Sequence, residues 1–211
     1  MSDVKVVQRA ALGAARRALA PETVAAASGS IAARLSQLPV FVQSPALLLY
    51  SASAEEVDTR SIRDAADRLA IPVYYPRFDR ERKNLEFVRV VPGEALHPGP
   101  WGIGEPRGSE CFGAGAAGLL VVPGVGFDRS GTRLGRGGGH YDRAIRRHRP
   151  PAIVVALGFA FQVVPSLPRF EWDEPVDVIV TEREVVECVA PSARHATHAA
   201  ARQARGSRGP D

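Results

Sequence analysis

Two hydrophobic patterns alternate along the chain. One is helical spacing, in which apolar residues recur every three or four positions; it covers residues 3–20 and resumes after Pro21, with Pro39 as the next interruption. The same spacing returns twice over shorter segments. The predicted helices are residues 3–20, residues 21–38, a segment capped by Asp58 or Thr59 that carries its apolar face to Leu69, and residues 141–147.

The other pattern consists of short apolar or alternating runs bounded by Gly, Pro or polar residues. Unbroken runs of this length are typical of strands that are buried on both faces of a sheet. The predicted strands are residues 46–50, 71–75, 85–91, 118–122, 152–158, 176–181 and, at an edge, 184–189. Helices that alternate with buried strands predict a single-domain α/β fold with a mostly parallel open sheet and helices on both faces.

The last twenty residues differ in composition from the rest of the chain. Residues 192–211 are rich in Ala, Arg, Gly and Ser without an apolar period, so we expect a disordered tail, dispensable for activity, after an α/β domain at residues 1–191. The tail carries +3 of the formal net charge of +4, whereas residues 1–191 hold 23 basic and 22 acidic residues. A nearly neutral body argues against a nucleic-acid partner. The alternative is an RNA-binding protein that uses the basic tail.

Other features of the composition exclude further classes of protein. No apolar stretch reaches the roughly 20 residues that span a bilayer, and the N-terminus lacks the apolar region of a secretory signal. We therefore expect a cytoplasmic monomer without a membrane partner. Cys111 and Cys188 have no metal-binding spacing and are expected to be two buried thiols.

Two irregular segments interrupt the pattern. Residues 92–117 contain seven Gly and four Pro, and residues 123–139 form a glycine-rich loop between a buried strand and a helix. In a parallel sheet this loop lies at the carboxyl edge, where ligands bind. Gly135 and residues 137–139 have no side chains, so their backbone N–H groups can approach a phosphate closely. Arg133 and Arg136 add positive charge, and the following helix adds its positive N-terminal end. The alternative is a loop whose glycines serve only for turning.

The loop also carries a family resemblance. The run VVPGVGFDRSGTRLGRGGGHYDR, residues 121–143, resembles the signature of the 5-formyltetrahydrofolate cyclo-ligases, also called methenyltetrahydrofolate synthetases. Further landmarks of that family are matched in order across residues 4–182, at Lys5 and Arg9, Tyr50 with residues 56–59, Pro76 and Arg77, Trp101 with Ile103, Glu105 and Pro106, residues 156–159, Gln162, Pro168, Asp173, Val176 and Asp177.

The resemblance implies a ligase that uses ATP and Mg²⁺ to convert 5-formyltetrahydrofolate into 5,10-methenyltetrahydrofolate. Phosphoryl transfer depends on positioning and charge neutralisation more than on protein nucleophiles, which agrees with the absence of a Ser/His/Asp pattern. By this resemblance the ATP-binding residues are Lys5, Arg9, Arg133, Leu134, Gly135, Arg136, Gly137, Gly138, Gly139, His140 and Tyr141.

The same resemblance implies the remaining roles. The residues expected to take part in catalysis are Arg133, Arg136, His140 and Tyr141; those expected to contact the folate are Ser51, Glu56, Trp101, Arg136 and His140; and those expected to hold Mg²⁺ are Asp142 and Asp177. Without the resemblance, Asp142 could equally complement the end of a helix, and Lys5 with Arg9 would read as a solvated helix face. Asp177 lies in an apolar run and needs a partner.

Two positions depart from the family pattern. His140 stands where the family usually has Tyr or Phe, and Trp172 where it often has His. We expect His140 to line the reaction site and, beside phosphates, to favour its protonated form. These departures also favour an alternative, in which a specialised or non-catalytic relative binds another formylated or phosphorylated small molecule.

Overall fold

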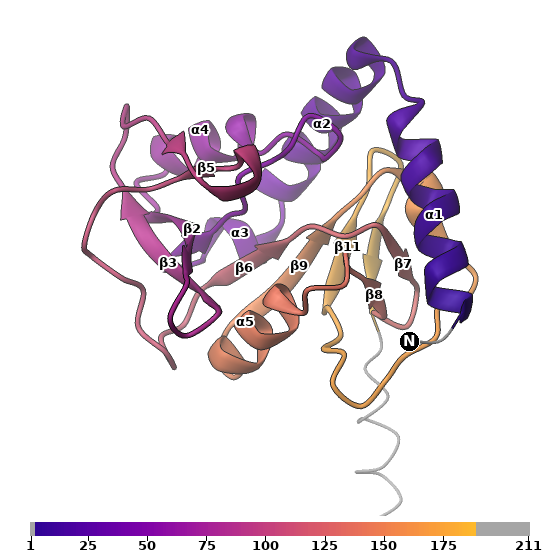
Figure 1. The fold of residues 1–211 in the computed structure, drawn as a ribbon. Helices are drawn as coiled ribbons and strands as arrows, with labels where there is room; N and C mark the ends of the chain where they lie inside the picture. Colours follow the sequence, from indigo (N-terminus) through magenta and orange to yellow (C-terminus); the bar gives the residue numbers. More distant parts are fainter. Residues whose placement is uncertain (1–2, 189–211) are drawn as a thin grey trace, which may run out of the picture.

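The computed structural model describes residues 3–188, and of Trp101 it describes the backbone only. The expected tail at 192–211 therefore lies outside the described residues. A seven-stranded sheet in the order β12-β11-β9-β6-β1-β2-β3 forms the centre of the molecule (Figure 1). Its strands are β1 (Leu47–Leu48), β2 (Val73–Asp79), β3 (Asn84–Val90), β6 (Leu119–Val122), β9 (Ile153–Leu157), β11 (Val178–Val180) and β12 (Val185–Glu187).

The sheet is parallel in its middle and antiparallel at its edges. Neighbouring strands from β2 to β11 run parallel, with Leu47 of β1 in register with Val73 and Leu119. Only β3 and β12 pair in the antiparallel sense. The prediction of a mostly parallel open sheet is confirmed, including the edge position of the strand expected at 184–189.

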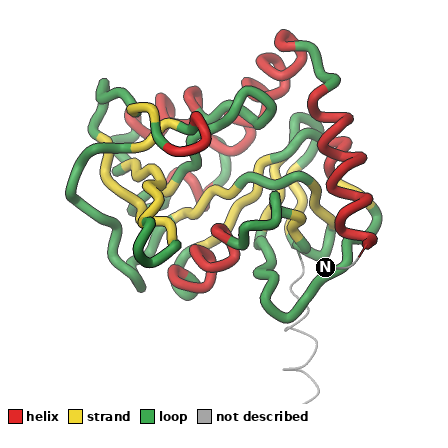
Figure 2. The backbone as a smooth tube through the Cα atoms, viewed as in Figure 1, coloured by secondary structure: helices red, strands yellow, loops and turns green. Residues whose placement is uncertain are grey.

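Helices cover both faces of this sheet, as predicted (Figure 2). Successive strand residues point to opposite faces, so Leu47 and Leu48 enter different cores. The first core contains residues of α2 (Pro21–Ser36), α3 (Pro39–Val42) and α4 (Arg60–Arg68), and the second contains Ala144 and Ile145 of α5 (His140–His148). The helix expected at 21–38 ends at Ser36, and Pro39 begins the short α3, because proline is well tolerated in a first helical turn.

The first helix, α1 (Asp3–Arg17), lies beside a second, smaller sheet (Figure 1). That sheet has the order β10-β7-β8, with β7 (Gly126–Asp128), β8 (Arg133–Leu134) and β10 (Val163–Val164), the last preceded by the 3₁₀ turn η2 (Ala160–Gln162). The prediction of one continuous loop at 123–139 was therefore wrong in its first part. The buried Asp128 carboxylate organises the β7–β8 turn by accepting hydrogen bonds from the amides of Ser130 and Thr132 at 2.9 and 3.1 Å.

The glycine- and proline-rich segment 92–117 is irregular, as expected. It contains the two-residue strands β4 (His97–Pro98) and β5 (Gly104–Glu105) and the 3₁₀ turn η1 (Pro100–Gly102). The prediction of two buried thiols was wrong, because Cys111 in this segment is exposed and Cys188 is half-buried. Cys111 pairs only through its backbone, as an isolated bridge to Val88 at the sheet edge. Within residues 3–188, no helix is both long and apolar enough to cross a membrane.

His148, at the end of α5, makes the stability of the fold dependent on pH. Its ring is only 2% exposed and lies edge-on to Phe87 with ring centroids 5.7 Å apart. Burial, and secondly the neighbouring Arg147, lower the pKa of His148 to about 4. Because the unfolded chain takes up this proton near pH 6.5 and the folded chain does not, the neutral ring contributes stability above pH 6.5 that is lost progressively down to about pH 4.

We therefore predict that the free energy of unfolding falls on going from pH 7 to pH 5, and that His148→Phe reduces the fall by about 1–2 kcal/mol. Urea unfolding of both proteins at the two pH values measures this. Equal losses in the two proteins would show that His148 does not sense pH.

Candidate active site

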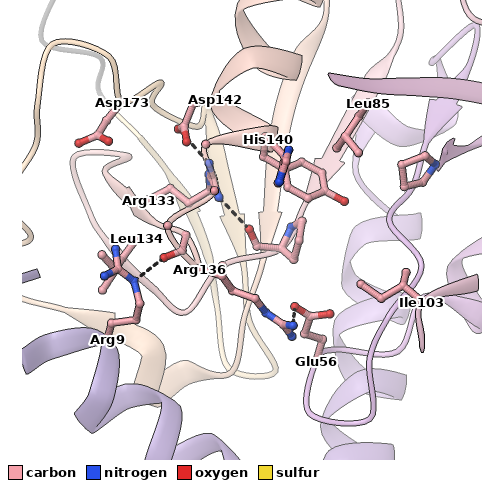
Figure 3. Close-up of a pocket in the computed structure, with 18 of the residues that line it drawn as sticks. Arg9, Glu56, Leu85, Ile103, Arg133, Leu134, Arg136, His140, Asp142 and Asp173 are labelled. Atoms are coloured by element: carbon pink, nitrogen blue, oxygen red, sulfur yellow. Dashed lines mark hydrogen bonds and ion pairs between the residues drawn. The ribbon is translucent and has the colours of Figure 1, made fainter. Parts of the chain in front are cut away.

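One pocket of about 900 Å³ gathers most of the predicted site residues at the carboxyl edge of the parallel strands (Figure 3). Segments that follow β1 and β6 meet there with α1, with β2 and with the start of α5. We call it the main pocket. Its lining residues are Lys5, Arg9, Ser51, Glu56, Pro76, Phe78, Leu85, Pro100, Ile103, Glu105, Pro123, Gly124, the whole segment 133–142, Phe170, Trp172 and Asp173.

The glycine segment at 135–139 lies along the wall of the main pocket as bare backbone. Gly137 has φ +108° and Gly139 has φ +64°, which L-residues with a Cβ rarely adopt. Gly139 is also the N-cap of α5, so the positive end of that helix begins at the pocket wall. The wall therefore presents backbone amides and a helix N-terminus, the combination that the sequence predicted for an anion.

Arg133 and Asp142 form an ion pair that joins the two ends of the glycine segment. An Arg133 Nη atom donates to Asp142 Oδ1 at 2.9 Å and the other donates to the carbonyl of Pro123 at 3.3 Å. The Arg133 side chain is only 3% exposed. The amide of Glu174 also donates to Asp142 Oδ1, at 3.3 Å. Arg133 thus acts on the pocket chiefly by fixing its neighbours.

Residues of α1, near the N-terminus of the chain, complete the lining of the main pocket. The buried Lys5 forms an ion pair with Asp173, and its Nζ lies 4.1 Å from the centroid of the Phe170 ring. Arg9 Nε donates to the carbonyl of Gly135 at 2.8 Å. The structure therefore brings both residues to the main pocket, and Arg9 to the glycine segment itself, so their interpretation as a solvated helix face was wrong.

Arg136 and Glu56 meet on another side of the pocket. Arg136 Nη2 lies 2.9 Å from both Glu56 Oε1 and Ser53 Oγ, while Glu56 Oε2 accepts from the Ser53 amide at 3.0 Å. Glu56 is buried, and Ser51 lines the same pocket. The expected folate-binding residues Ser51, Glu56 and Arg136 thus share one pocket with the glycine segment.

His140 lines the pocket in its neutral form. Burial, and secondly the nearby Arg143 guanidinium, lower the pKa of His140 below 6.5. Since arginine only donates, the 2.9 Å contact between Arg143 Nη2 and His140 Nδ1 makes Nδ1 the acceptor. The ring is therefore neutral in the protein without ligand, and the expectation that neighbouring phosphates favour its protonated form stays a prediction. Next to it, burial and secondly the Glu56 carboxylate raise the pKa of the Tyr141 hydroxyl.

The structure does not bring Asp177 to the main pocket. Its carboxylate pairs with Arg149 and accepts from the Val154 amide at 2.8 Å. Both contacts lie at the amino-terminal ends of β9 and β11, whereas Asp142 lies at the start of α5. The pairing of Asp142 with Asp177 around one metal ion was therefore wrong. The partner that a carboxylate in an apolar run requires is Arg149.

The acid that does share the pocket with Asp142 is Asp173. Sequence reasoning treated Asp173 only as a family landmark, because an acid between Trp172 and Glu174 in an irregular segment carries no signal that sets it apart from its neighbours. Phe78, Leu85 and Phe170 were also missed, because apolar residues in strands and loops read as core. The prediction for Trp101 concerns a side chain outside the described residues; its neighbours Pro100 and Ile103 line the pocket.

Comparisons with known proteins agree with this geometry. The model of the 5-formyltetrahydrofolate cyclo-ligase family matches residues 1–182. The Escherichia coli 5-formyltetrahydrofolate cyclo-ligase is 31% identical over 180 residues, which cover 82% of this chain and 97% of that protein. The mouse enzyme of the same name is 28% identical over 153 residues, covering 67% and 75%.

Solved structures extend the agreement to the fold. The NMR structure of Aquifex aeolicus 5,10-methenyltetrahydrofolate synthetase superposes with a TM-score of 0.77 at 32% identity, covering 87% of this chain and 92% of that one. A synthetase from Mycoplasma pneumoniae has a TM-score of 0.68 at 19% identity, covering 86% and 99%, and supports the fold alone. The chain belongs to the 5-formyltetrahydrofolate cyclo-ligase family, whose members are ligases of folate one-carbon metabolism.

Proposed function

We propose that this protein uses ATP and Mg²⁺ to convert 5-formyltetrahydrofolate into 5,10-methenyltetrahydrofolate, releasing ADP and phosphate. The observation that carries the proposal is a single pocket in which a bare glycine backbone with cationic neighbours faces an apolar wall. A reaction that transfers a phosphoryl group from a nucleotide to a folate needs both surfaces in contact.

The two surfaces divide the ligands between them. The glycine segment at 135–139, the start of α5 and the nearby Lys5 suit the phosphates of ATP. Phe78, Leu85 and Ile103 offer apolar contact to the folate ring system, and the Glu56 carboxylate can accept hydrogen bonds from its amino and ring N–H groups. The boundary between the two surfaces lies at His140 and Tyr141, where the reacting atoms would meet.

The reaction consists of two substitutions. The formyl oxygen on N5 attacks the γ-phosphorus, the bond to the β–γ bridging oxygen breaks, and ADP leaves. N10 then attacks the formyl carbon, and the C–O bond breaks to release phosphate, while the proton of N10 passes to a base. The formyl oxygen leaves as phosphate because oxide itself is a poor leaving group. The protein's part is to align the two ligands and neutralise charge.

Cations and donors of the chain supply that neutralisation. Arg136 lines the pocket while its Nη2 donates to Glu56 and Ser53. The backbone amides of the glycine segment are fixed in position, so they can stabilise developing charge without reorganisation. Tyr141 keeps its proton, since burial raises the pKa of its hydroxyl, and so it can donate to a developing oxyanion. His140 carries a proton on Nε2 while Nδ1 is occupied by Arg143.

Asp142 and Asp173 fit a magnesium ion. Both line the main pocket, and among the described residues Asp142 Oδ2 and Asp173 Oδ1 accept no hydrogen bond, because the neighbouring donors all use the other oxygen of each carboxylate. Across residues 3–188 there is no group of three or more His, Cys, Asp or Glu side chains that could enclose a metal. Two carboxylates, completed by phosphate oxygens and water, match the usual magnesium site, in which the ion offsets phosphate charge.

The proposal includes the wider sequence-based expectations. We propose a cytoplasmic monomer with 5-formyltetrahydrofolate and ATP as its partners and with no part in nucleic-acid or membrane binding. The near balance of charge in residues 1–191 supports the exclusion of nucleic acid.

The direct test is to mix the purified protein with ATP, Mg²⁺ and 5-formyltetrahydrofolate and to follow the near-ultraviolet absorbance of the methenyl product. We expect absorbance to rise only when all three are present. ATP binding without any product would instead support a specialised relative that acts on another formylated or phosphorylated molecule, the alternative that His140 and Trp172 favour.

The carboxylates of the pocket give a sharper prediction. Asp142→Asn and Asp173→Asn should each raise the magnesium concentration needed for half-maximal activity by about tenfold or more, because a neutral amide is a poorer ligand for a hard cation. Asp177→Asn is the matched control, since Asp177 is also paired with an arginine but lies outside the pocket. Magnesium titrations of the initial rate measure all three. A shift with Asp177→Asn alone would restore the original assignment.

The effect of backbone conformation in the glycine segment can be tested separately from the effect of added side-chain volume. A Cβ on Gly137 would meet no atom within 4 Å, so Gly137→Ala changes only the conformational preference at φ +108°. We predict that this substitution destabilises the fold by about 1–2 kcal/mol and raises the KM for ATP at least threefold.

The matched control is Gly93→Ala, which has φ +81° and equally open surroundings but lies in a turn outside the pocket. It should cost similar stability and leave the KM for ATP unchanged. Urea unfolding and steady-state kinetics compare the two. The same KM for ATP in both variants would mean that the conformation at Gly137 does not matter for the nucleotide.

A further inference from the structure

A second, smaller pocket of about 250 Å³ adjoins the main pocket. Its charged lining consists of Arg9, Arg16, Arg17, Arg136 and Glu55, and we call it the arginine pocket. Arg9 and Arg136 line both pockets, so the two spaces meet at these side chains. None of the roles assigned above involves Arg16, Arg17 or Glu55.

The arginine pocket holds more positive charge than the protein itself compensates. Arg16 is only 5% exposed, and it donates to the Gly124 carbonyl at 3.2 Å and to Glu55 at 3.3 Å, while its Nε has no hydrogen-bond partner. Arg9 has its Nε on a backbone carbonyl. Among the ion pairs of the described residues, none includes Arg9 or Arg17. Like charges at close range repel, and a buried guanidinium with an unpaired N–H is costly, so the pocket favours an anion.

The position of the carboxylates indicates which kind of anion this is. In Figure 3, Asp142 and Asp173 lie on one side of the glycine segment, and Arg9, Arg136 and Glu56 lie on the other. Phosphates that travel with a divalent cation suit the first side. The arginine pocket has Glu55 as its one acid, already paired with Arg16. An anion that binds without a metal fits there, and the planar fork of arginine matches a carboxylate in particular.

We propose that the arginine pocket binds the glutamate carboxylates at the far end of the folate substrate. This inference rests on the proposed function. 5-Formyltetrahydrofolate reacts at N5 and N10 of its ring system, and it ends in a glutamate with two carboxylates. With the ring system in the main pocket, the tail passes between Arg9 and Arg136, and its carboxylates meet Arg16 and Arg17.

Fragment binding tests the subsite without any need for turnover. Calorimetry compares p-aminobenzoylglutamate with p-aminobenzamide, a neutral fragment that lacks the glutamate and has no carboxylate. We expect the first to bind the unmodified protein at least tenfold more tightly, because hydrogen bonds between guanidinium and carboxylate groups are stronger than those between neutral groups. Arg16→Gln and Arg17→Gln should each weaken the first fragment at least threefold and leave the second unchanged. Glu55→Gln, which removes the competing carboxylate, should tighten the first.

Arg68→Gln is the matched control, because Arg68 is an exposed arginine at the end of α4, outside both pockets. It should leave the affinity for both fragments unchanged. Arg17 is exposed on α1, so its variant keeps the test valid if the buried Arg16 proves necessary for folding. Equal affinity for the two fragments, or equal weakening of both by the arginine variants, overturns the proposal.

Kinetics separate this inference from the proposed function. With 5-formyltetrahydrofolate, Arg17→Gln should raise the KM for the folate but not the KM for ATP. The effect should vanish with 5-formyltetrahydropteroamide, in which a neutral amide replaces the glutamate. A rise in the KM for ATP instead would assign the pocket to a nucleotide phosphate and overturn the proposal. Fragment discrimination without turnover would refute the proposed function alone, whereas turnover without discrimination would refute the glutamate subsite alone.

Discussion

The ion pair between Arg133 and Asp142 is the constraint on which the candidate site depends. The glycine segment between them has almost no side chains of its own with which to pack, so it cannot fix its own position. Arg133 ties the beginning of α5, through Asp142, to the carbonyl of Pro123 at the end of β6. Because the Arg133 side chain is almost fully buried, removal of either partner would leave an uncompensated charge at a cost of about 3–5 kcal/mol. The loop conformation is thereby linked to the stability of the sheet.

A second constraint on the site comes from α1, which is more than a hundred residues before the glycine segment in the sequence. Arg9 holds the carbonyl of Gly135, and Lys5 holds Asp173 beside Asp142. Side chains of one helix therefore fix both the anion-binding backbone and the proposed metal ligands. Because α1 packs on the small sheet, the position of these groups depends on the contact between that helix and β7 as well as on the core of the large sheet.

Physical reasons explain how much of this could be predicted from the sequence. The buried strands and the helices were predictable because unbroken apolar runs such as that of β6, and helical spacing such as that of α2, determine which side chains must leave water. The β7–β8 hairpin was missed because glycines and a buried Asp128 replace its apolar alternation. Glu56, Arg136 and the glycine segment could be placed at one site through the family resemblance. Asp177 was misplaced and Asp173 missed, because which end of the sheet a carboxylate faces depends on tertiary contacts such as that with Arg149.

The charges of the site are paired before any ligand binds, and this affects what binding must achieve. Lys5 is held by Asp173, Arg133 by Asp142 and Arg136 by Glu56. Such pairs keep the guanidinium and ammonium groups oriented, so less side-chain entropy is lost on binding than for free surface cations. An incoming phosphate must then share these cations with their carboxylates, and a cation that accompanies the phosphate relieves the resulting repulsion at Asp142 and Asp173. Within residues 3–188, Arg9 and Arg17 have no carboxylate partner, and this difference in pairing is the physical basis for proposing a metal-associated anion on one side of the loop and a bare carboxylate on the other.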